Sequence, residues 1–279
     1  MSSLAHGTDS PQGCVACHSG IEVISPSHAF SCEKCHGGIP GAKQRAEAHA
    51  GLIANPSDLA YAQERCGRCH PREVHRVRRS LMATAAGEIN TTRYLGGAQE
   101  DAGARYGTMK IDGMQLIPEV EKSGDLVDDL LRRKCLRCHL NTRGASRKGE
   151  FRASGCAACH VLYADNGLSR SNDRAIKSLM AAARKGTKVL ERGYPVKHRL
   201  SAAIPTSQCL HCHNGNGVGM DYVGLFERDE DGNYRFLSPD RKAKNFIYGI
   251  ARHGLLPDIH NEKGLACIGG FKLQRGVAG

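Results

Sequence analysis

The sequence predicts a mainly α chain with much irregular backbone and little β-structure, packed around bound groups instead of a large core of its own. Large apolar side chains are scarce, because the 279 residues include no Trp, 6 Phe and 8 Tyr. The 33 glycines weaken helices and allow the backbone to approach another group closely. The 13 cysteines are an odd number, which argues against a closed disulfide framework.

One pattern accounts for twelve of these cysteines. The sequence C-x-x-C-H occurs as CVACH, CEKCH, CGRCH, CLRCH, CAACH and CLHCH. Its cysteines are Cys14, Cys17, Cys32, Cys35, Cys66, Cys69, Cys135, Cys138, Cys156, Cys159, Cys209 and Cys212, and its histidines are His18, His36, His70, His139, His160 and His213. This pattern is the attachment signature of c-type haem, in which both thiols bond to the porphyrin and the adjoining imidazole ligates the iron.

Two other interpretations of the pattern are weaker. A single C-x-x-C-H could be half of a zinc site or a thioredoxin-like redox pair. Zinc ribbons need no histidine at that fixed position, and redox pairs do not recur six times in one chain. We therefore expect six haems, whose porphyrins replace the missing aromatic core and whose propionates balance much of the +11 net charge. No basic patch interleaved with aromatic residues supports nucleic-acid binding.

Eight further histidines could ligate the opposite faces of the six irons. They are His28, His49, His198, His260, His253, His75, His6 and His211. Because eight histidines are available for six irons, we expect every iron to have two histidine ligands and no open position. Irons of this kind transfer electrons rather than bind substrate. His28 precedes Cys32 by four residues, so it can ligate that haem or its neighbour. For His75 the alternative is a solvent-exposed side chain that binds no iron. Met82 is the methionine that could replace a histidine as an iron ligand.

Helical patterns cover residues 58–66, 72–86, 125–140 and 172–191. In the third, Leu126, Leu130, Leu131 and Cys135 fall on one side, and the acidic residues precede the basic ones, as the helix dipole favours. Asn172 is the expected N-cap of the last helix. Strand signals are short and lie chiefly in FERDEDGNYRFL, where Asp231-Gly232 could turn a hairpin.

The longest interval between motifs contains NTTRYLGGAQEDAGARYGTMKIDG, which we expect to be loop with short strands at most. It is the predicted boundary between a three-haem lobe at 1–110 and another at 111–279, although a continuous haem array argues against separate folding units. No stretch reaches 18 consecutive apolar residues, so we expect no membrane span. The first residues lack the basic and apolar regions of a secretory signal.

With these motifs, the whole chain resembles the multihaem c-type cytochromes of anaerobic, metal- and sulfur-respiring bacteria. The similarity is strongest from CAACH through KHRLSAAIPTSQCLHCH to LPDIHNEKGLAC, a block that looks like one in large periplasmic or surface-associated cytochromes. The resemblance implies a haem-packed cytochrome c array, a periplasmic or extracellular location, and redox proteins or terminal acceptors as partners. Self-association is a further expectation.

In similar cytochromes the sequence GLAC continues into another C-x-x-C-H. Cys267 falls on the first cysteine of such a site, but Gly270 and Phe271 stand where cysteine and histidine are needed. We expect Cys267 to be the relic of a seventh site in a chain shortened from a longer cytochrome; a free buried thiol or an intermolecular disulfide is the alternative. Bacterial haem attachment takes place outside the cytoplasmic membrane, so a cytochrome needs a leader peptide for export. We expect that the leader was removed or was lost in the same shortening.

Three functions agree with this interpretation. The first is electron transfer in anaerobic or extracellular respiration, with no catalytic residue. The second is a multihaem reductase of a small nitrogen or sulfur oxyanion with one open haem site; the absence of C-x-x-C-K removes one version of it. The third is a subunit of a cytochrome filament, in which His6 could serve a neighbouring subunit.

Overall fold

The computed structural model describes residues 13–118, 124–142, 152–163, 168–185, 195–213, 225–227, 243–247, 250–254 and 258–268. This part of the chain is mainly helical with little sheet, as the sequence predicts. Its longer helices are α3 (Leu59–Arg65), α4 (Pro71–Arg79), α6 (Ala86–Leu95), α10 (Arg174–Arg184) and α11 (Thr206–His213). The shorter helical segments are η1 (Gly13–Ala16), η2 (Pro26–His28), α1 (Cys32–His36), α2 (Arg45–Ala48), α5 (Leu81–Thr84), α8 (Leu126–Leu130), η3 (Leu131–Cys135), η4 (Leu136–Cys138), α9 (Ala157–His160) and α13 (Ile259–Glu262).

The strands form three small sheets. β1 (Tyr106–Gly107) and β2 (Gln115–Leu116) pair in parallel, and β3 (Val161–Tyr163) pairs antiparallel with β4 (Pro195–Leu200). The third sheet has the order β5-β7-β6, formed by Leu225–Glu227, Ile250–Gly254 and Ala243–Ile247. β5 falls in the region where strands are expected but pairs with β7, Leu225 opposite Gly254. The expected turn at Asp231-Gly232 lies outside the described residues.

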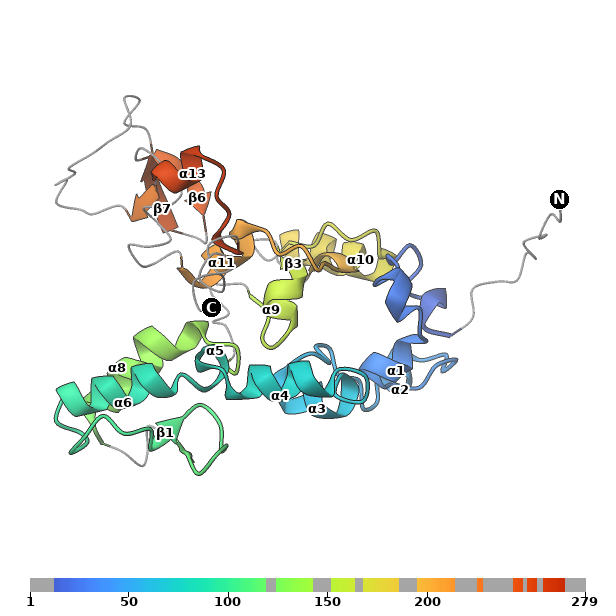
Figure 1. Cartoon of the computed structure of the whole chain (residues 1–279). Helices are drawn as coiled ribbons and strands as arrows, with labels where there is room; N and C mark the ends of the chain where they lie inside the picture. The colour runs from blue at the N-terminus through green and yellow to red at the C-terminus, as the bar shows by residue number, and fades with distance from the viewer. Residues whose placement is uncertain are drawn as a thin grey trace, which may run out of the picture.

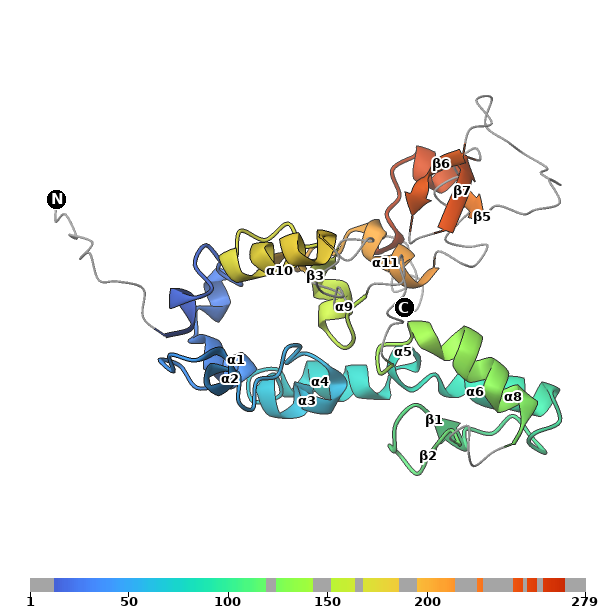
Figure 2. The same cartoon turned by 180° about the vertical axis from the view of Figure 1, so that it is seen from behind.

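The helices lie in two rows that meet at the N-terminal end of the described chain. Figures 1 and 2 show α1 to α6 along one side of the molecule and α10, α9 and α11 along the other. At the junction, Arg174 N–H donates to the Ser19 carbonyl at 3.0 Å, and Leu200 N–H donates to the Ile24 carbonyl at 2.8 Å. Segments far apart in sequence are thus joined through residues 19 to 24.

The second row also meets the first at its middle, where the turn before α9 crosses Ser57. The Ser57 carbonyl accepts from Cys156 N–H at 3.2 Å, and its hydroxyl accepts from Ala157 N–H at 2.8 Å. Gly155 has a φ of +63°, and a Cβ atom there would come within 1.9 Å of the Ser57 carbonyl oxygen. This close crossing therefore requires glycine.

Two of the predicted helices have the expected place. α3 begins after Asp58, whose carboxylate accepts from Ala60 N–H at 3.0 Å. α10 forms as predicted as far as the described residues reach, but its cap is Asp173 instead of Asn172: the Asp173 carboxylate accepts from Ala175 N–H at 2.8 Å. Asn172 is displaced from this role because its own N–H donates to Glu22 at 2.8 Å.

The predicted helix 72–86 is divided. α4 ends at Arg79 because Ser80 is extended, and the Ser80 hydroxyl then accepts from Ala83 N–H and begins α5. Ala85 follows in the left-handed region, with a φ of 53°, and starts α6 in a new direction. The local hydroxyl bond of Ser80 competes with the helical hydrogen bonds, which explains the break.

The predicted helix 125–140 changes geometry twice. After α8 the chain forms one π-turn, η3, and then the 3₁₀-turn η4. The predicted apolar face is wrong for Leu126 and Leu130, which are 84% and 51% exposed, and right for Leu131, which is fully buried, and for Cys135, which packs against the same cluster. The inward face of α8 is set instead by Asp128, which is 1% exposed and forms an ion pair with buried Arg93.

The expected loop NTTRYLGGAQEDAGARYGTMKIDG is helical at its start, since α6 extends to Leu95. Buried Asn90 holds this helix to the following segment. Its amide donates to the Tyr106 carbonyl at 2.8 Å, and its oxygen accepts from the Arg105 and Tyr106 N–H groups at 3.0 Å each. These long-range hydrogen bonds stabilise the helix although the hydrophobic periodicity of this stretch is weak. One short strand of the kind expected in this stretch is present as β1, and its partner β2 follows just after the stretch.

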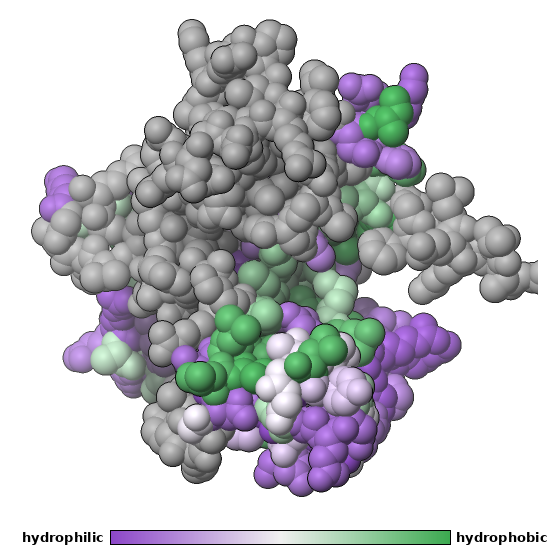
Figure 3. Space-filling model, turned by 90° about the vertical axis from the view of Figure 1, so that its left-hand side faces the viewer, coloured by the Kyte–Doolittle hydropathy of each residue, from purple (hydrophilic) through white to green (hydrophobic). Residues whose placement is uncertain are grey.

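The apolar core is small and divided. One cluster contains Leu59, Ala62, Val74, Ala83, Met109 and Leu140; the others contain Ala85, Ile89, Leu131 and Leu136, and Ala153, Ala157 and Val161. No side chain is buried between Gly13 and Asp58. Apolar surface gathers at the end of the molecule formed by α6 and α8 (Figure 3), where Leu95 and Leu126 are exposed.

None of the helices in the described residues combines the length and apolar character that a membrane crossing requires.

Candidate haem-binding sites

Each C-x-x-C-H motif forms about one helical turn. The N–H of His18, His70 and His160 donates to the carbonyl of the first cysteine of its own motif, at 3.0, 2.8 and 3.0 Å. The second and sixth motifs lie in α1 and α11, and the fourth spans the end of η3 and η4. Residues i, i+3 and i+4 lie on one face of such a turn, so both thiols and the imidazole can face one group.

Three motif histidines lie against histidines from outside the motifs. The ring centroids of His18 and His49 are 6.1 Å apart, and those of His70 and His28 are 5.9 Å apart. His36 lies 6.0 Å from His198 of β4, which comes from the distant row of helices. Among the eight additional histidines, His49, His28 and His198 thus lie against a motif histidine. His28 therefore lies at the third motif. This agrees with the second of the two expectations from the sequence, that His28 ligates a haem next to that of its own motif.

These separations fit two imidazoles that share one metal ion. Two metal–nitrogen bonds of about 2 Å, with rings on opposite sides of the ion, put the ring centroids about 6 Å apart. Rings in ordinary contact cover a similar range of distances, so the direction of the ring nitrogens decides between the two cases. A metal ligand that binds through Nε2 donates its Nδ1–H to a nearby acceptor.

Backbone carbonyls hold the Nδ1 atoms of several of these rings. His36 Nδ1–H donates to the Ile53 carbonyl at 2.9 Å, and Ile53 N–H donates back to the His36 carbonyl at 2.7 Å. His160 and Ser201 form the same reciprocal pair, at 2.9 and 2.8 Å. His198 Nδ1–H donates to the Glu22 carbonyl at 3.1 Å. These bonds fix the tautomer that leaves Nε2 for a metal.

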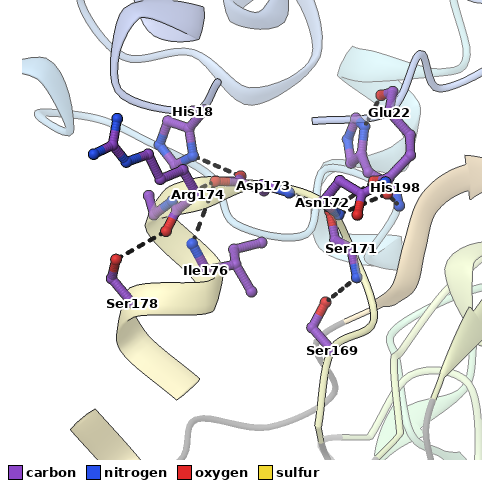
Figure 4. A network of polar contacts seen from close by, with 11 residues as sticks. His18, Glu22, Ser169, Ser171, Asn172, Asp173, Arg174, Ile176, Ser178 and His198 are labelled. Carbon is purple, nitrogen blue, oxygen red and sulfur yellow. Dashed lines mark hydrogen bonds and ion pairs between the residues drawn. The ribbon is translucent and has the colours of Figure 1, made fainter. Parts of the chain in front are cut away.

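His18 differs, because its acceptor is a carboxylate. His18 Nδ1 lies 2.8 Å from the carboxylate of Asp173, which is 0% exposed (Figure 4). The same carboxylate accepts from Ala175 N–H at the start of α10. A buried carboxylate behind a ligating imidazole increases the basicity of that ligand. Asp173 therefore both caps a helix and polarises the first motif histidine.

A second carboxylate, Glu22, joins the same loop to β4. It accepts from the Ser171 hydroxyl at 2.6 Å, from Asn172 N–H at 2.8 Å and from His198 N–H at 3.2 Å (Figure 4). Burial raises the pKa of Glu22, but these hydrogen bonds outweigh it and lower the pKa to about 2. One loop thus holds the positions of His18 and His198, which belong to two candidate sites.

The thiols show which motifs are neighbours. Cys32 lies beside Cys14, and Cys66 lies near Cys156 and Cys35. The fifth and sixth motifs are joined by Gln208, whose amide donates to the Ala158 carbonyl at 3.1 Å. Cys212 Sγ lies 3.0 Å from the Cys138 carbonyl. The first, second, third, fifth and sixth motifs are therefore neighbours in that order. The fourth motif adjoins the sixth and also the fifth, because the Leu140 carbonyl accepts from Gly155 N–H at 2.9 Å. The neighbour order first, second, third, fifth, sixth and fourth motif is thus not the order of the sequence.

Burial keeps most of these thiols protonated. Burial is the main cause that raises the pKa of Cys66, Cys135 and Cys209 to about 11 in each case. The pKa of Cys212 is raised as well, mainly by the Cys138 side chain and then by burial.

The fourth motif histidine meets a carboxylate instead of a histidine. His139 Nε2 lies 2.5 Å from Glu88 Oε2 on α6, and the ring also hydrogen-bonds to the backbone of Met82. Burial lowers the pKa of His139, but Glu88 outweighs it and the pKa is raised. The His139 hydrogen bond lowers the pKa of Glu88.

The other predicted ligands have different surroundings. His75 is exposed on α4, and exposed His260 donates to Asp258 at 2.6 Å. His211 Nε2 lies 3.2 Å from Gln208 Oε1. His6 and the side chain of His253 lie outside the described residues, and His213, at the end of α11, is exposed.

Cys267 lies at the sixth motif. Its thiol is close enough to the Cys209 thiol to form a hydrogen bond, and its N–H lies 3.4 Å from the Thr206 hydroxyl. Gly270 and Phe271 lie outside the described residues, so the relic of a seventh site stays a prediction.

The sequence alone did not identify Asp173, Glu22 or Glu88. Carboxylates have no fixed spacing from a haem motif, and each of these contacts a histidine far away in sequence. The serine-rich loop SRSNDR before α10 is the one usable signal, because it combines several capping residues.

In the described ranges, no three His, Cys, Asp or Glu side chains converge on a site for a metal ion. Comparison of the chain with protein-family models, with curated proteins and with solved structures gives no match.

Proposed function

We propose that this chain carries electrons through six covalently bound c-type haems. The observation that supports it most is the set of three histidine pairs, in which a motif histidine faces another histidine at 5.9 to 6.1 Å. Each pair joins an attachment motif to a ligand of the type that bis-His haem needs. We assign the pairs His18–His49, His36–His198 and His70–His28 to the first three haems.

The protein's part in this function is to fix the imidazoles. The Nδ1 bonds of His36, His198 and His18 prevent ring rotation and leave Nε2 directed away from the anchoring groups. When bound, haem iron supplies one-electron chemistry between its ferric and ferrous forms. With an imidazole on each face of the iron, no position is left for a substrate. The residues around the site would therefore set the redox potential of the haem and hold its ligands rigid.

The neighbour order of the motifs supports a continuous route for electrons. Consecutive motifs in the order first, second, third, fifth, sixth, fourth are linked by thiol neighbours or by short hydrogen bonds. We propose that electrons pass along this order between redox partners at the two ends. A periplasmic or extracellular location, in anaerobic respiration, belongs to the same proposal.

The experiment replaces one partner of the most distant pair. In the haem-loaded protein, His198→Ala removes one bis-His iron, so the electron paramagnetic resonance spectrum loses one low-spin signal and gains a high-spin one. His75→Ala is the matched control, because His75 is an exposed histidine of α4, and it leaves the spectrum unchanged. An unchanged spectrum in His198→Ala, or a protein without haem, contradicts the proposal.

A further inference from the structure

The fourth candidate site differs from the first three at the nitrogen that would bind iron. At His18, His36 and His70, the ring faces a second imidazole. At His139, Nε2 faces the carboxylate of Glu88 at 2.5 Å. In the described residues, no second histidine ring lies against His139.

The position of Glu88 is built into the fold. Glu88 lies in the first turn of α6, which is held by the buried Asn90 and by the ion pair of Arg93 with Asp128. Its side chain is 36% exposed and reaches the Cys135 thiol as well as His139. The carboxylate therefore contacts two of the three residues that would hold the fourth haem.

The site also has a particular place in the array. The fourth motif is linked to the sixth through Cys138 and Cys212, and to the fifth through Gly155 N–H, which donates to the Leu140 carbonyl at 2.9 Å. Electrons from either neighbouring motif could therefore reach the fourth iron, whose motif histidine directs Nε2 at a carboxylate oxygen.

We propose, on the basis of the proposed function, that Glu88 is the exchangeable sixth ligand of the fourth haem and that this iron binds small ligands of the class of cyanide and nitrite. A carboxylate is a weaker ligand of haem iron than imidazole, so an added ligand can displace it. The present hydrogen-bond distance is shorter than two metal–ligand bonds of about 2 Å would allow. Glu88 must therefore move outward to admit the iron, which its flexible side chain permits.

The first test is the spin state of the oxidised, haem-loaded wild-type protein. The proposal expects a high-spin ferric signal that accounts for one haem per chain, which added cyanide converts to low spin. A spectrum without high-spin iron, together with no cyanide binding, overturns it.

The second test is cyanide titration of Glu88→Gln. Removal of the charged carboxylate that competes for the iron should increase cyanide affinity roughly tenfold, which corresponds to about 1.4 kcal/mol. Glu73→Gln is the matched control, because Glu73 is an exposed glutamate of α4 just after the third motif, and its affinity should equal that of wild type. Equal affinities in all three proteins overturn the proposal.

The haem count separates this proposal from the proposed function. If the protein has six haems and three bis-His irons but does not bind cyanide, the proposed electron transfer still holds and the proposed role of Glu88 is wrong. A protein without covalently bound haem removes both.

Discussion

Residues 13–58 and residues 81–140 are organised in opposite ways. The first region has no buried side chain, yet it contributes four of the six histidines in the three ring pairs. The second has a conventional core around Ile89 and Leu131, with buried Asn90 and a buried ion pair, and its motif histidine faces Glu88. We infer from this comparison that the first region would depend on the proposed haems for order, whereas the second is stabilised by its own side chains.

This difference also separates two chemical roles. Where imidazoles face each other across about 6 Å, the proposed haems between them would decide both the local fold and the redox behaviour. Where the polypeptide supplies the core, a carboxylate can be held beside the motif without a second histidine. The predictions below test this division, from the largest expected effect to the smallest.

Production of the chain without haem should have the largest effect. We expect residues 13–58 to lose protection from amide hydrogen exchange, because no apolar core remains to hold them. Residues 81–140 should keep measurable protection, since their core does not need haem. Hydrogen-exchange mass spectrometry of the haem-free and haem-loaded proteins measures both regions; equal loss of protection in both would remove the distinction.

Asn90→Ala should destabilise the second region by about 3 kcal/mol, because each buried polar group left without a partner costs about 1–3 kcal/mol. Asn90 is 1% exposed and makes four hydrogen bonds. Urea unfolding gives the change in free energy. Asp112→Asn is the control: it removes the exposed Arg79 ion pair and should cost about 0.5 kcal/mol or less. If the two variants are equally stable, Asn90 does not hold α6.

Asp173→Asn tests the first region through its redox potential. Asparagine still caps α10 and can accept from His18, but it has no charge to stabilise ferric iron. The potential of the first haem should rise by tens of millivolts, on the order of the 59 mV that a tenfold change represents for one electron. Spectroelectrochemical titration measures it, with Ser178→Ala of α10 as the control. A potential that stays at the wild-type value would show that Asp173 only caps the helix.

Glu22→Gln should have the smallest effect, and that effect should depend on pH. The pKa of Glu22 is lowered from 4.5 to about 2, so the folded state binds fewer protons than the unfolded state there. The stabilisation is therefore present above pH 4.5 and is lost as the pH falls toward 2. Because Glu22 is partly exposed, we expect a loss of about 1 kcal/mol or less at pH 7. Urea unfolding at pH 7 and at pH 3 should show a smaller difference at the lower pH; a constant difference contradicts the assignment.

The sequence predicts the local parts of these sites well. The C-x-x-C-H spacing identifies the residues that form each turn, and the patterns before Arg65 and Arg184 predict α3 and α10. These features depend on neighbouring residues, whose interactions are set by helical periodicity.

The pairing of the sites could not be predicted. His36 and His198 lie in different rows of the molecule, and their approach depends on the Glu22 and Asp173 contacts of one loop. The π-turn before Cys135 has no distinctive composition either. Such features follow from long-range packing, which overrides local propensity.

The central claim is that six C-x-x-C-H motifs carry covalently bound haem, and intact-mass spectrometry of the denatured protein tests it most directly. The account predicts the mass of the polypeptide plus six haem groups that survive denaturation. A mass equal to that of the bare polypeptide would contradict it.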